Sequence, residues 1–465
     1  MIGRRTTARP IQRISRRGLI GSGMLAGVLS ATGVPVMAQS RGGVLRLGLG
    51  GAHATDGWDT RVRQGAFMRV LGHGAVYDCL TEISATGELT GELAESWDAG
   101  PDARVWLFNL RRDVLFHDGT PFDAEAVVAS LTAHLAPDVS SPVRLLVAQI
   151  ARMEILNHHQ VQFTLGTPNV DFPLLLADPH LVIAPSGQLH RGIGTGLYRV
   201  AQFVPGQAAR LIRMASHYKD GRAGWFDAVE VTAANHGPAR MRLLLDGKAD
   251  VVNRVVLAMA PQLQATRGIR IAEVTGSQHL VAAIPGQVDQ ATHKGLAEVI
   301  DRQAVVDDLL AGHGSIAQDH PIGPLNQHMA GQQIVHDPDR AVRTASQLGI
   351  KADPAGLVWR LSAGRLTEDW ALSVAAGPGG AWNETLGSHE QFNRLLREAR
   401  ATFDSTRRRE LYETLQFMCQ TEGGVCVPAY VNHVDAHSVR LAHPDALGNL
   451  YGMDSARIIE RWWFA

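Results

Sequence analysis

The sequence predicts an α/β protein, and residues 105–130 show this most clearly. Val105–Leu110 has mostly apolar side chains at both alternating sets of positions, which is typical of a strand covered on both faces. Asp118 and the glycine after it form a turn signal. Asp123 stands where a helix N-cap is expected, and Val127 belongs to the apolar stripe of that helix. A strand followed by a turn and a capped helix indicates the α/β class.

Other stretches add elements of both kinds. Residues 43–50 alternate apolar and polar side chains and predict a first strand. Apolar residues recur at helical spacing over residues 388–403 and 405–420, which predicts two successive helices. Residues 425–434 then predict a strand that returns toward the first part of the protein.

An export leader precedes these elements. Residues 1–38 contain six arginines and no acidic residue, and an apolar, Gly-rich run occupies residues 19–37. Such a run is typical of a secretory signal peptide and is too short and too rich in glycine for a membrane anchor. Residues 15–20 read Ser-Arg-Arg-Gly-Leu-Ile, close to the twin-arginine export signal, and Ala38 ends the expected cleavage site. We therefore expect a twin-arginine signal peptide over residues 1–38 and a periplasmic mature protein, with an uncleaved basic anchor as the alternative.

The composition of the mature chain excludes several kinds of partner. Removing 38 of the 465 residues leaves 427, enough for two or three domains. Six of the 44 basic residues lie in the leader, so 38 basic and 45 acidic side chains remain and the net charge is −7. This charge argues against nucleic acid or an anionic membrane as partner. Cys79, Cys419 and Cys426 supply no disulfide framework, although the last two could form one bridge or stay buried as free thiols.

Four motifs follow one another between residues 94 and 130. The chain reads Ala-Glu-Ser-Trp at 94–97, Leu-Arg at the end of a strand at 110–111, Phe-His-Asp-Gly-Thr-Pro at 116–121 and Ala-Val-Val-Ala-Ser at 126–130. This order resembles the solute-binding proteins of ABC importers, in the family with dipeptide-, oligopeptide- and nickel-binding members. The family usually has Asp-Val where Ala126 and Val127 stand.

The resemblance implies a two-lobe periplasmic binding protein fold, type II-like, with a subdomain inserted in lobe I. The implied division is residues 39–75, 188–275 and 437–465 for the core of lobe I, 76–187 for the inserted subdomain and 276–436 for lobe II. Lobe II is expected to be shortened around residues 350–363, because family members usually have a further strand, helix and strand there. The remaining strands either re-close into a smaller lobe or leave an incomplete sheet, which soluble proteins avoid.

The resemblance also places candidate residues at the cleft. His73 and Tyr77 lie in or beside a segment similar to the family's Val-Tyr-x-x-Leu-Thr, which borders the cleft. Thr195 lies in a segment similar to the family's Gly-Thr-Gly-x-Tyr, whose glycines permit close backbone approach to a ligand or to the neighbouring lobe. A histidine that is satisfied by the backbone is the alternative for His73.

The loop over residues 362–370 bears most directly on the solute. In dipeptide and oligopeptide binders the corresponding loop has a Trp and then an Asp that pairs with the peptide's free ammonium group. When the two loops are aligned, Ser362 occupies the position of that Trp and Arg365 occupies the position of that Asp. A cation there disfavours a peptide N-terminus and can bind a carboxylate or another anion. Alternatively, Arg365 pairs with Glu368 or Asp369 and only shapes the loop.

Aromatic residues on nearby loops complete the set of candidates. Trp382, beside Asn383, could stack on a ligand or could instead fill the lobe interior. The candidate solute-binding residues are His73, Tyr77, Thr195, Arg365, Glu368, Trp370, Trp382 and Asn383.

The sequence predicts a binding protein and no enzyme. It has no Gly-x-Ser-x-Gly motif and no Cys/His arrangement of a known spacing. Four histidines gather between residues 313 and 336, but their spacing does not match a metal site, so we expect neither metal nor cofactor. We expect a monomer that captures a small solute of the peptide or peptide-like class, or an anionic one, and delivers it to an ABC permease at the inner membrane. The alternative is a degenerate family member whose shortened second lobe no longer binds solute and which acts as an interaction module.

Overall fold

The computed structural model describes residues 41–465 apart from 63, 284–294, 296, 331–335, 349–356, 376–388 and 423–425. The predicted signal peptide, Trp382, Asn383 and the first half of the 350–363 segment therefore lie outside the described residues. Among the helices that are described, none is both long and apolar enough to cross a bilayer.

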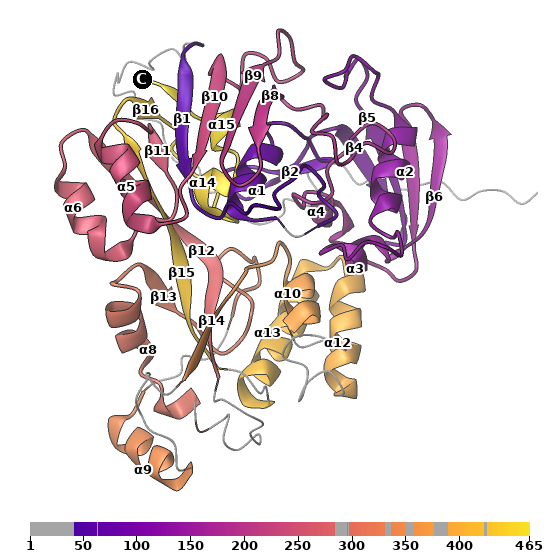
Figure 1. Cartoon of the computed structure of the whole chain (residues 1–465). Coiled ribbons are helices and arrows are strands. Elements are labelled where there is room, and N and C mark those ends of the chain that lie inside the picture. The colour runs from indigo at the N-terminus through magenta and orange to yellow at the C-terminus, as the bar shows by residue number, and fades with distance from the viewer. Residues whose placement is uncertain are drawn as a thin grey trace, which may run out of the picture.

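One mixed sheet of nine strands runs through both halves of the molecule (Figure 1). Its order is β14-β12-β15-β11-β1-β10-β9-β8, and β13 also pairs with β15. The strands are β1 (Val44–Leu49), β8 (Tyr198–Val204), β9 (Ala208–Arg213), β10 (Ala228–Ala233), β11 (Val251–Val252), β12 (Ile269–Ala283), β13 (Gly314–Ile316), β14 (Val358–Ser362) and β15 (Cys426–Ser438). The predicted first strand is confirmed as β1, which pairs in parallel with β10 and β11.

Helices cover both faces of this sheet in the upper half of Figure 1. Leu45, Leu47 and Leu49 of β1 are buried in a cluster with helix α1 (Ala66–Gly72) and the C-terminal helix α15 (Ile458–Arg461). On another side, helix α5 (Gly237–Leu245) packs Met241 against Val252 of β11. Burial on both faces is what parallel strands require.

A second, four-stranded sheet forms the core of the inserted region. Its order is β4-β5-β7-β6, with β4 (Ala94–Ala99), β5 (Val105–Leu110), β6 (Ile150–Asn157) and β7 (Gln160–Leu165). The predicted strand is confirmed as β5, although only the face with Trp106, Phe108 and Leu110 is fully buried and the opposite face is half-buried. The predicted helix is α2 (Ala124–Ala133), and Asp123 caps it by accepting the N–H of Ala126 at 2.9 Å.

The lower half of the molecule has a continuous sheet in the part of the chain that is described. There β13 and β12 flank the first half of β15, and β14 pairs with β12 along residues 279–283. Helices α10 (Glu368–Ala375), α12 (Glu390–Ala401) and α13 (Ser405–Glu422) pack together beside it through Leu372, Phe392 and Leu415. The two helices predicted over residues 388–420 are thus confirmed as α12 and α13. Cys419 and Cys426 are buried free thiols.

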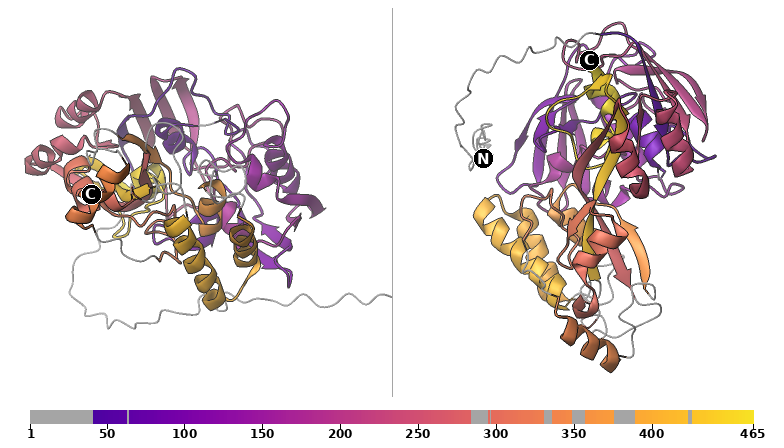
Figure 2. Two further views of the ribbon diagram at one scale, coloured as in Figure 1. Left: turned by 90° about the horizontal axis from the view of Figure 1, so that it is seen from below. Right: turned by 90° about the vertical axis from the view of Figure 1, so that its left-hand side faces the viewer.

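Two long strands, β12 and β15, connect the upper and lower halves (Figures 1 and 2). Their pairing shifts register between Val274 and Gln278, so β12 bends there. At Gly276 a Cβ atom would lie 2.4 Å from the carbonyl oxygen of Val431, which explains why a glycine occupies the bend. The bend falls at the expected start of lobe II, residue 276, and we propose that the lobes divide and hinge here.

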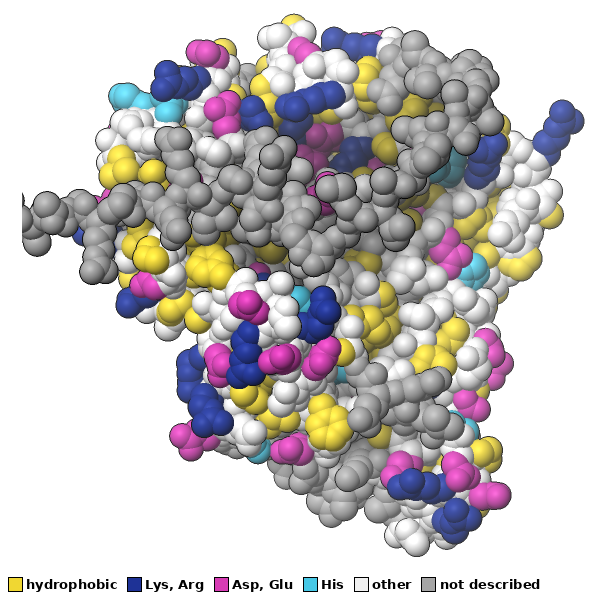
Figure 3. Space-filling model, turned by 180° about the vertical axis from the view of Figure 1, so that it is seen from behind, with side chains coloured by type: hydrophobic (Ala, Val, Ile, Leu, Met, Phe, Trp, Pro, Cys, Tyr) yellow, Lys and Arg dark blue, Asp and Glu magenta, His cyan; other side chains and the backbone are white. Residues whose placement is uncertain are grey.

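Short elements complete the chain. They are β2 (Thr81–Ile83), β3 (Leu89–Gly91), α3 (Arg144–Val147), α4 (Phe172–Leu175), η1 (Leu257–Met259), α6 (Ala260–Ala265), α8 (Arg302–Ala304), η2 (Val305–Leu309), α9 (Pro338–Leu348), β16 (Leu441–Ala442), α14 (Gly452–Ser455) and β17 (Trp463–Phe464). On the face seen in Figure 3, acidic and basic side chains are intermixed over the lower half, as on an ordinary solvated surface.

Candidate functional site

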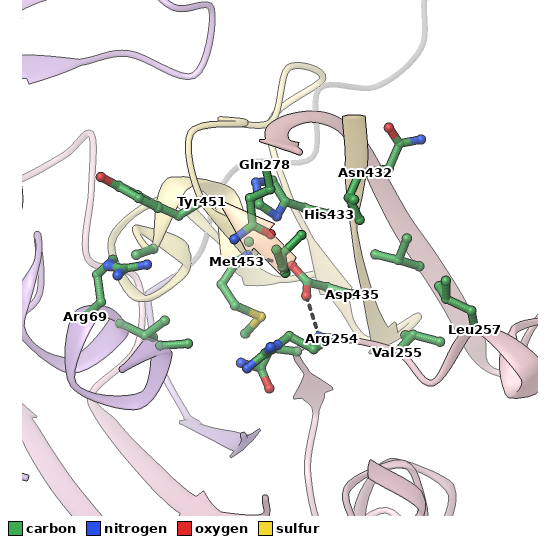
Figure 4. A pocket seen from close by; sticks show the side chains of 18 residues that line it. Arg69, Arg254, Val255, Leu257, Gln278, Asn432, His433, Asp435, Tyr451 and Met453 are labelled. Carbon is green, nitrogen blue, oxygen red and sulfur yellow. Dashed lines mark hydrogen bonds between the residues drawn. The ribbon is translucent and has the colours of Figure 1, made fainter. Parts of the chain in front are cut away.

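A cavity of about 320 Å³ lies where β12 and β15 pass from one half of the molecule to the other (Figure 4). This volume suits a small molecule. Both halves contribute to its walls. The lining residues are Ala66, Arg69, Val70, Asn253, Arg254, Val255, Leu257, Gln278, Leu361, Val431, Asn432, His433, Val434, Asp435, Tyr451, Gly452, Met453 and Ala456.

Two arginines bring positive charge to the cavity. Arg69 projects from α1, and its guanidinium carbon lies 4.3 Å from the centre of the Tyr451 ring. The Arg69 Nε atom is buried and has no hydrogen-bond partner among the described residues. Arg254 follows β11 in a left-handed conformation, with φ of 52°, and its side chain is exposed. A buried guanidinium N–H without an acceptor is costly, so an anionic group placed beside Arg69 would be stabilised.

Asp435 fixes two segments of the cavity wall. Its two carboxylate oxygens accept the N–H of Arg254 at 2.9 Å and the N–H of Met453 at 2.5 Å, and Figure 4 marks the first of these bonds. Burial raises the pKa of Asp435 to about 6, while the two N–H donors and the charges of Arg240 and Arg254 act in the opposite direction. The carboxyl group is therefore mostly ionised at pH 7.

The wall near Met453 is a left-handed turn. Met453, Asp454, Ser455 and Ala456 have φ values of 62°, 57°, 56° and 65°. Such a conformation costs about 1–2 kcal/mol per residue, so it needs strong anchors. Besides the bond to Asp435, the Asp454 carboxylate accepts the N–H of Gly448 at 2.6 Å and an N–H of Arg461 at 2.9 Å. These bonds hold Met453 and Ala456 against the cavity.

The other polar groups of the wall are neutral at physiological pH. Burial, together with the positive charge of Arg69, lowers the pKa of His433 to about 4. Burial raises the pKa of Tyr451 to about 12, although Arg69 and Arg365 oppose this change. Among the described lining residues, two cations therefore face one anion, and the cavity has a net positive charge at pH 7.

Three of the residues expected at the cleft make internal contacts instead of lining this cavity. His73 is buried, and its Nε2 atom accepts a hydrogen bond from the Arg457 Nε–H at 3.3 Å. The Tyr77 hydroxyl donates to the carbonyl of Leu189 at 3.2 Å. The Thr195 hydroxyl donates to the Asp78 carboxylate at 2.8 Å. A direct role of these three in solute binding stays a prediction.

The loop with Arg365 lies near the cavity without lining it. The guanidinium carbon of Arg365 is 5.4 Å from the centre of the Trp370 ring, and its Nε atom is buried without a hydrogen-bond partner among the described residues. Glu368 accepts the backbone N–H of His328 at 2.9 Å, and Asp369 pairs with Arg400 at 2.9 Å. Both acidic residues that could have paired with Arg365 thus have other partners.

A buried network of charges explains the position of His73. The Lys219 ammonium lies 3.2 Å from Asp78, 2.6 Å from Glu92 and 2.7 Å from Glu460. Arg457, which contacts His73, also pairs with Glu92 and Glu460, at 2.8 and 2.6 Å. Three carboxylates, Glu82, Glu92 and Glu460, approach one another closely enough to bind a metal ion, but the two cations already occupy the space between them. This network is structural.

Sequence reasoning missed both the cavity and the charge network. The cavity lining spans residues 66–456, and Lys219 is separated from Glu92 by 127 positions and from Glu460 by 241. No local pattern joins residues so far apart. The available signal was the single Arg69 on an otherwise apolar helix, which reads Ala-Phe-Met-Arg-Val-Leu-Gly.

A two-lobe α/β fold with a cavity at the crossing of two long strands defines the class of periplasmic binding proteins. Residues 88–384, more than half of the chain, match the model of bacterial extracellular solute-binding proteins, family 5. The chain belongs to this family. Its members are binding proteins for transport and not enzymes, in agreement with the absence of catalytic motifs noted in the sequence.

Solved structures support the fold. The periplasmic binding protein AgaA of A. tumefaciens R10, in complex with agropinic acid, is 20% identical with a TM-score of 0.79, and the match covers 91% of this chain and 99% of that one. DppA of Helicobacter pylori, in complex with the peptide STSA, is 18% identical with a TM-score of 0.76 over 92% and 99% of the two chains. At these identities the likeness establishes the two-lobe fold.

Curated relatives match more locally. The probable D,D-dipeptide-binding periplasmic protein DdpA of Escherichia coli K12 is 24% identical over 280 residues, which are 55% of this chain and 52% of that protein. The chain thus spans about half the length of this curated relative.

Proposed function

We propose that this chain is the periplasmic solute-binding component of an ABC importer. It captures a small solute with an anionic group in the cavity between its lobes and delivers that solute to a permease at the inner membrane. The observation that carries the proposal is Arg69, whose buried Nε–H faces no acceptor of the described chain at the wall of the cavity.

The charges of the cavity favour an anion over a neutral or cationic solute. Arg69 and Arg254 provide planar donor groups that suit a carboxylate, while Asp435 already accepts two backbone N–H groups. His433 and Tyr451 are neutral and can contribute hydrogen bonds without adding charge. The agropinic acid named for the AgaA structure is an example of an acidic solute held by a protein of similar fold.

The loop at Arg365 supports the same class of solute. Peptide binders of the family have an aspartate there for the peptide ammonium group, whereas this chain has a cation. The positive charge of Arg365 opposes the rise in the pKa of Tyr451, which lines the cavity. An acidic, peptide-like solute without a free ammonium group at that position fits this arrangement.

The alternative of a degenerate lobe II is less well supported. The strands β14, β12, β15 and β13 form a continuous sheet, and α10, α12 and α13 have a common apolar core. A lobe with its own sheet and core can close as a rigid body.

A binding screen with the mature protein tests the proposal. Agropinic acid, glutathione, the peptide Ser-Thr-Ser-Ala, the nickel–histidine complex and glucose would be titrated while tryptophan fluorescence is recorded. Each acid would also be compared with its methyl ester, which has nearly the same shape and no charge. We expect at least one acid to bind, with its ester bound about tenfold more weakly or worse, because a charge-assisted hydrogen bond contributes about 1.5–3 kcal/mol.

Arg69→Gln provides the second arm of the screen. We expect the acid to lose about tenfold or more in affinity with this variant. Arg210→Gln should leave the affinity unchanged, since Arg210 pairs with Glu230 and both side chains are exposed. Binding of glucose alone, or binding of nothing by a cooperatively folded protein, would count against the proposal.

A further inference from the structure

The two halves of the molecule touch at a second place, apart from β12 and β15. The Arg408 side chain on α13 lies 2.5 Å from the carboxylate of Asp171, which precedes α4 of the inserted subdomain. The Arg408 and Asp171 side chains are only 13% and 6% exposed. One residue away, the N–H of Val170 donates to the carbonyl of Arg400 on α12 at 3.0 Å. A buried ion pair and a backbone hydrogen bond thus join the helices of lobe II to lobe I.

On the lobe II side of this contact, neighbouring groups of the same lobe hold the Arg408 side chain in position. Arg408 donates to the carbonyl of Ala399 at 3.2 Å and to the Tyr412 hydroxyl at 3.2 Å. Its guanidinium carbon lies 5.3 Å from the centre of the Tyr412 ring, which also stacks on the His328 ring. The guanidinium group is therefore oriented before the lobes meet, which reduces the entropy lost when the pair forms.

The lobe I side is also ordered locally. The backbone N–H of Asp171 donates to the Asn169 side chain at 2.9 Å, and its carbonyl accepts the N–H of Leu175 at 3.1 Å. Apolar contact accompanies the ion pair, because the half-buried Trp370 of α10 packs against the core of the inserted subdomain. If the lobes rotated apart at the Gly276 bend, these groups would become exposed to water.

We propose that Asp171 and Arg408 form a latch that holds the two lobes in the closed arrangement. The pair exists only while the lobes touch, so it lowers the free energy of the closed state relative to the open one, whatever solute is bound. Closing the lobes shields both charged groups from water, so removing one partner leaves the other buried without a counter-charge, which costs more than the loss of an exposed ion pair. The latch rests on the two-lobe fold and does not depend on the proposed solute class.

Distance measurements on the protein without added solute test the latch. Spin labels would be attached to Leu145→Cys on α3 and Phe417→Cys on α13, where the native side chains are 76% and 46% exposed. The three native cysteines are buried and would not react. Electron–electron double resonance then gives the population of short, closed distances and long, open ones.

We expect Asp171→Asn and Arg408→Gln each to raise the ratio of open to closed molecules on the order of tenfold, the equivalent of ~1.4 kcal/mol. The double variant should open little more than either single variant, since both remove the same interaction. Arg407→Gln is the matched control, because the adjacent Arg407 pairs with Glu398 and Glu410 inside lobe II and should leave the distances unchanged.

Two results would overturn the latch. One is a distance distribution for Asp171→Asn that equals that of the wild type, and the other is a wild type that is open by itself. Asp171→Asn keeps the size of the side chain, and Asp171 makes no other side-chain ion pair among the described residues, so this variant should fold even if Arg408→Gln does not. Thermal unfolding of each labelled variant would confirm that the distances report on folded protein.

Discussion

At the scale of single residues, the cavity depends on a few side chains that do more than one task. Asp435 holds Arg254 and Met453 by their backbone N–H groups, and both of those residues have positive φ. The same carboxylate is the described anion of the cavity wall, so it also limits how strongly the cavity attracts negative charge. The Arg69 guanidinium stacks on Tyr451 and its charge also lowers the pKa of the buried Asp178, while its Nε–H has no hydrogen-bond partner among the described residues.

The pKa of Asp435 leads to a prediction at this scale. Burial raises the pKa to about 6 in the folded protein from an ordinary value of 3.8. A carboxyl whose folded pKa is raised adds stability below the unfolded pKa and loses this contribution as the pH rises through about 6. Asparagine does not titrate. The free energy of unfolding of the wild type, minus that of Asp435→Asn, should therefore fall by ~1 kcal/mol between pH 5 and pH 8.

Urea unfolding of both proteins at pH 5, 6, 7 and 8 measures this difference. A difference that stays constant over the range would mean that burial does not raise the pKa of Asp435, because an ordinary or a lowered pKa lies below pH 5.

At the scale of elements, the bend of β12 is the feature most sensitive to a small change. Gly276 has no room for a Cβ atom, which would lie 2.4 Å from the Val431 carbonyl oxygen of β15. Gly276→Ala must therefore push the two strands apart at the hinge, and we expect it to destabilise the protein by about 1–3 kcal/mol. Thermal or urea unfolding measures the loss.

Gly57→Ala is the control for the bend. A Cβ atom at Gly57 would meet no atom within 4 Å, and the residue needs no left-handed conformation. Its effect should stay within about 0.5 kcal/mol. Equal stability of the Gly276 and Gly57 variants would show that the strands are not closely apposed at residue 276.

The buried charge network leads to a second prediction at the scale of elements. It joins the β2–β3 region, Lys219 and the C-terminal helix α15 through ion pairs with Asp78, Glu92 and Glu460. Lys219→Met keeps the length of the side chain but leaves these carboxylates with too little positive charge. We expect a loss of about 3–5 kcal/mol, because breaking a buried pair leaves an uncompensated charge.

Lys248→Met is the matched control for this prediction. Its side chain is 70% exposed and lies 3.9 Å from Asp246, so its removal should change the urea midpoint very little. If Lys219→Met were as stable as Lys248→Met, the ion pairs of Lys219 would not contribute to stability, contrary to this prediction.

At the scale of the whole molecule, the parts that the sequence predicted are those with local signals. The cap at Asp123, the strand at Val105–Leu110 and the helices α12 and α13 each depend on patterns within about 20 residues, and the structure confirms them. One expectation for that strand was wrong: we expected both of its faces to be covered, but the face with Val105 is only half-buried. The family resemblance supplied the two-lobe arrangement, which periodicity alone could not.

The site was harder to predict for a physical reason. Tertiary folding brings Arg69, Arg254 and Asp435 together from segments that share no local pattern. The sequence also does not reveal which polar residues are already satisfied, so Thr195, whose hydroxyl bonds to Asp78, looked like a contact for solute. Arg365 was found through a comparison of charge with the family, and it lies beside the Trp370 ring near the cavity.

Native mass spectrometry of the protein, purified from bacterial cells without added solute, tests the proposed class of solute without a guess of the ligand. We expect a fraction of the molecules to carry a small acidic compound, and we expect this fraction to be lost in Arg69→Gln but not in Arg210→Gln. A compound without an acidic group, or one that Arg69→Gln retains as well as the wild type does, would contradict it.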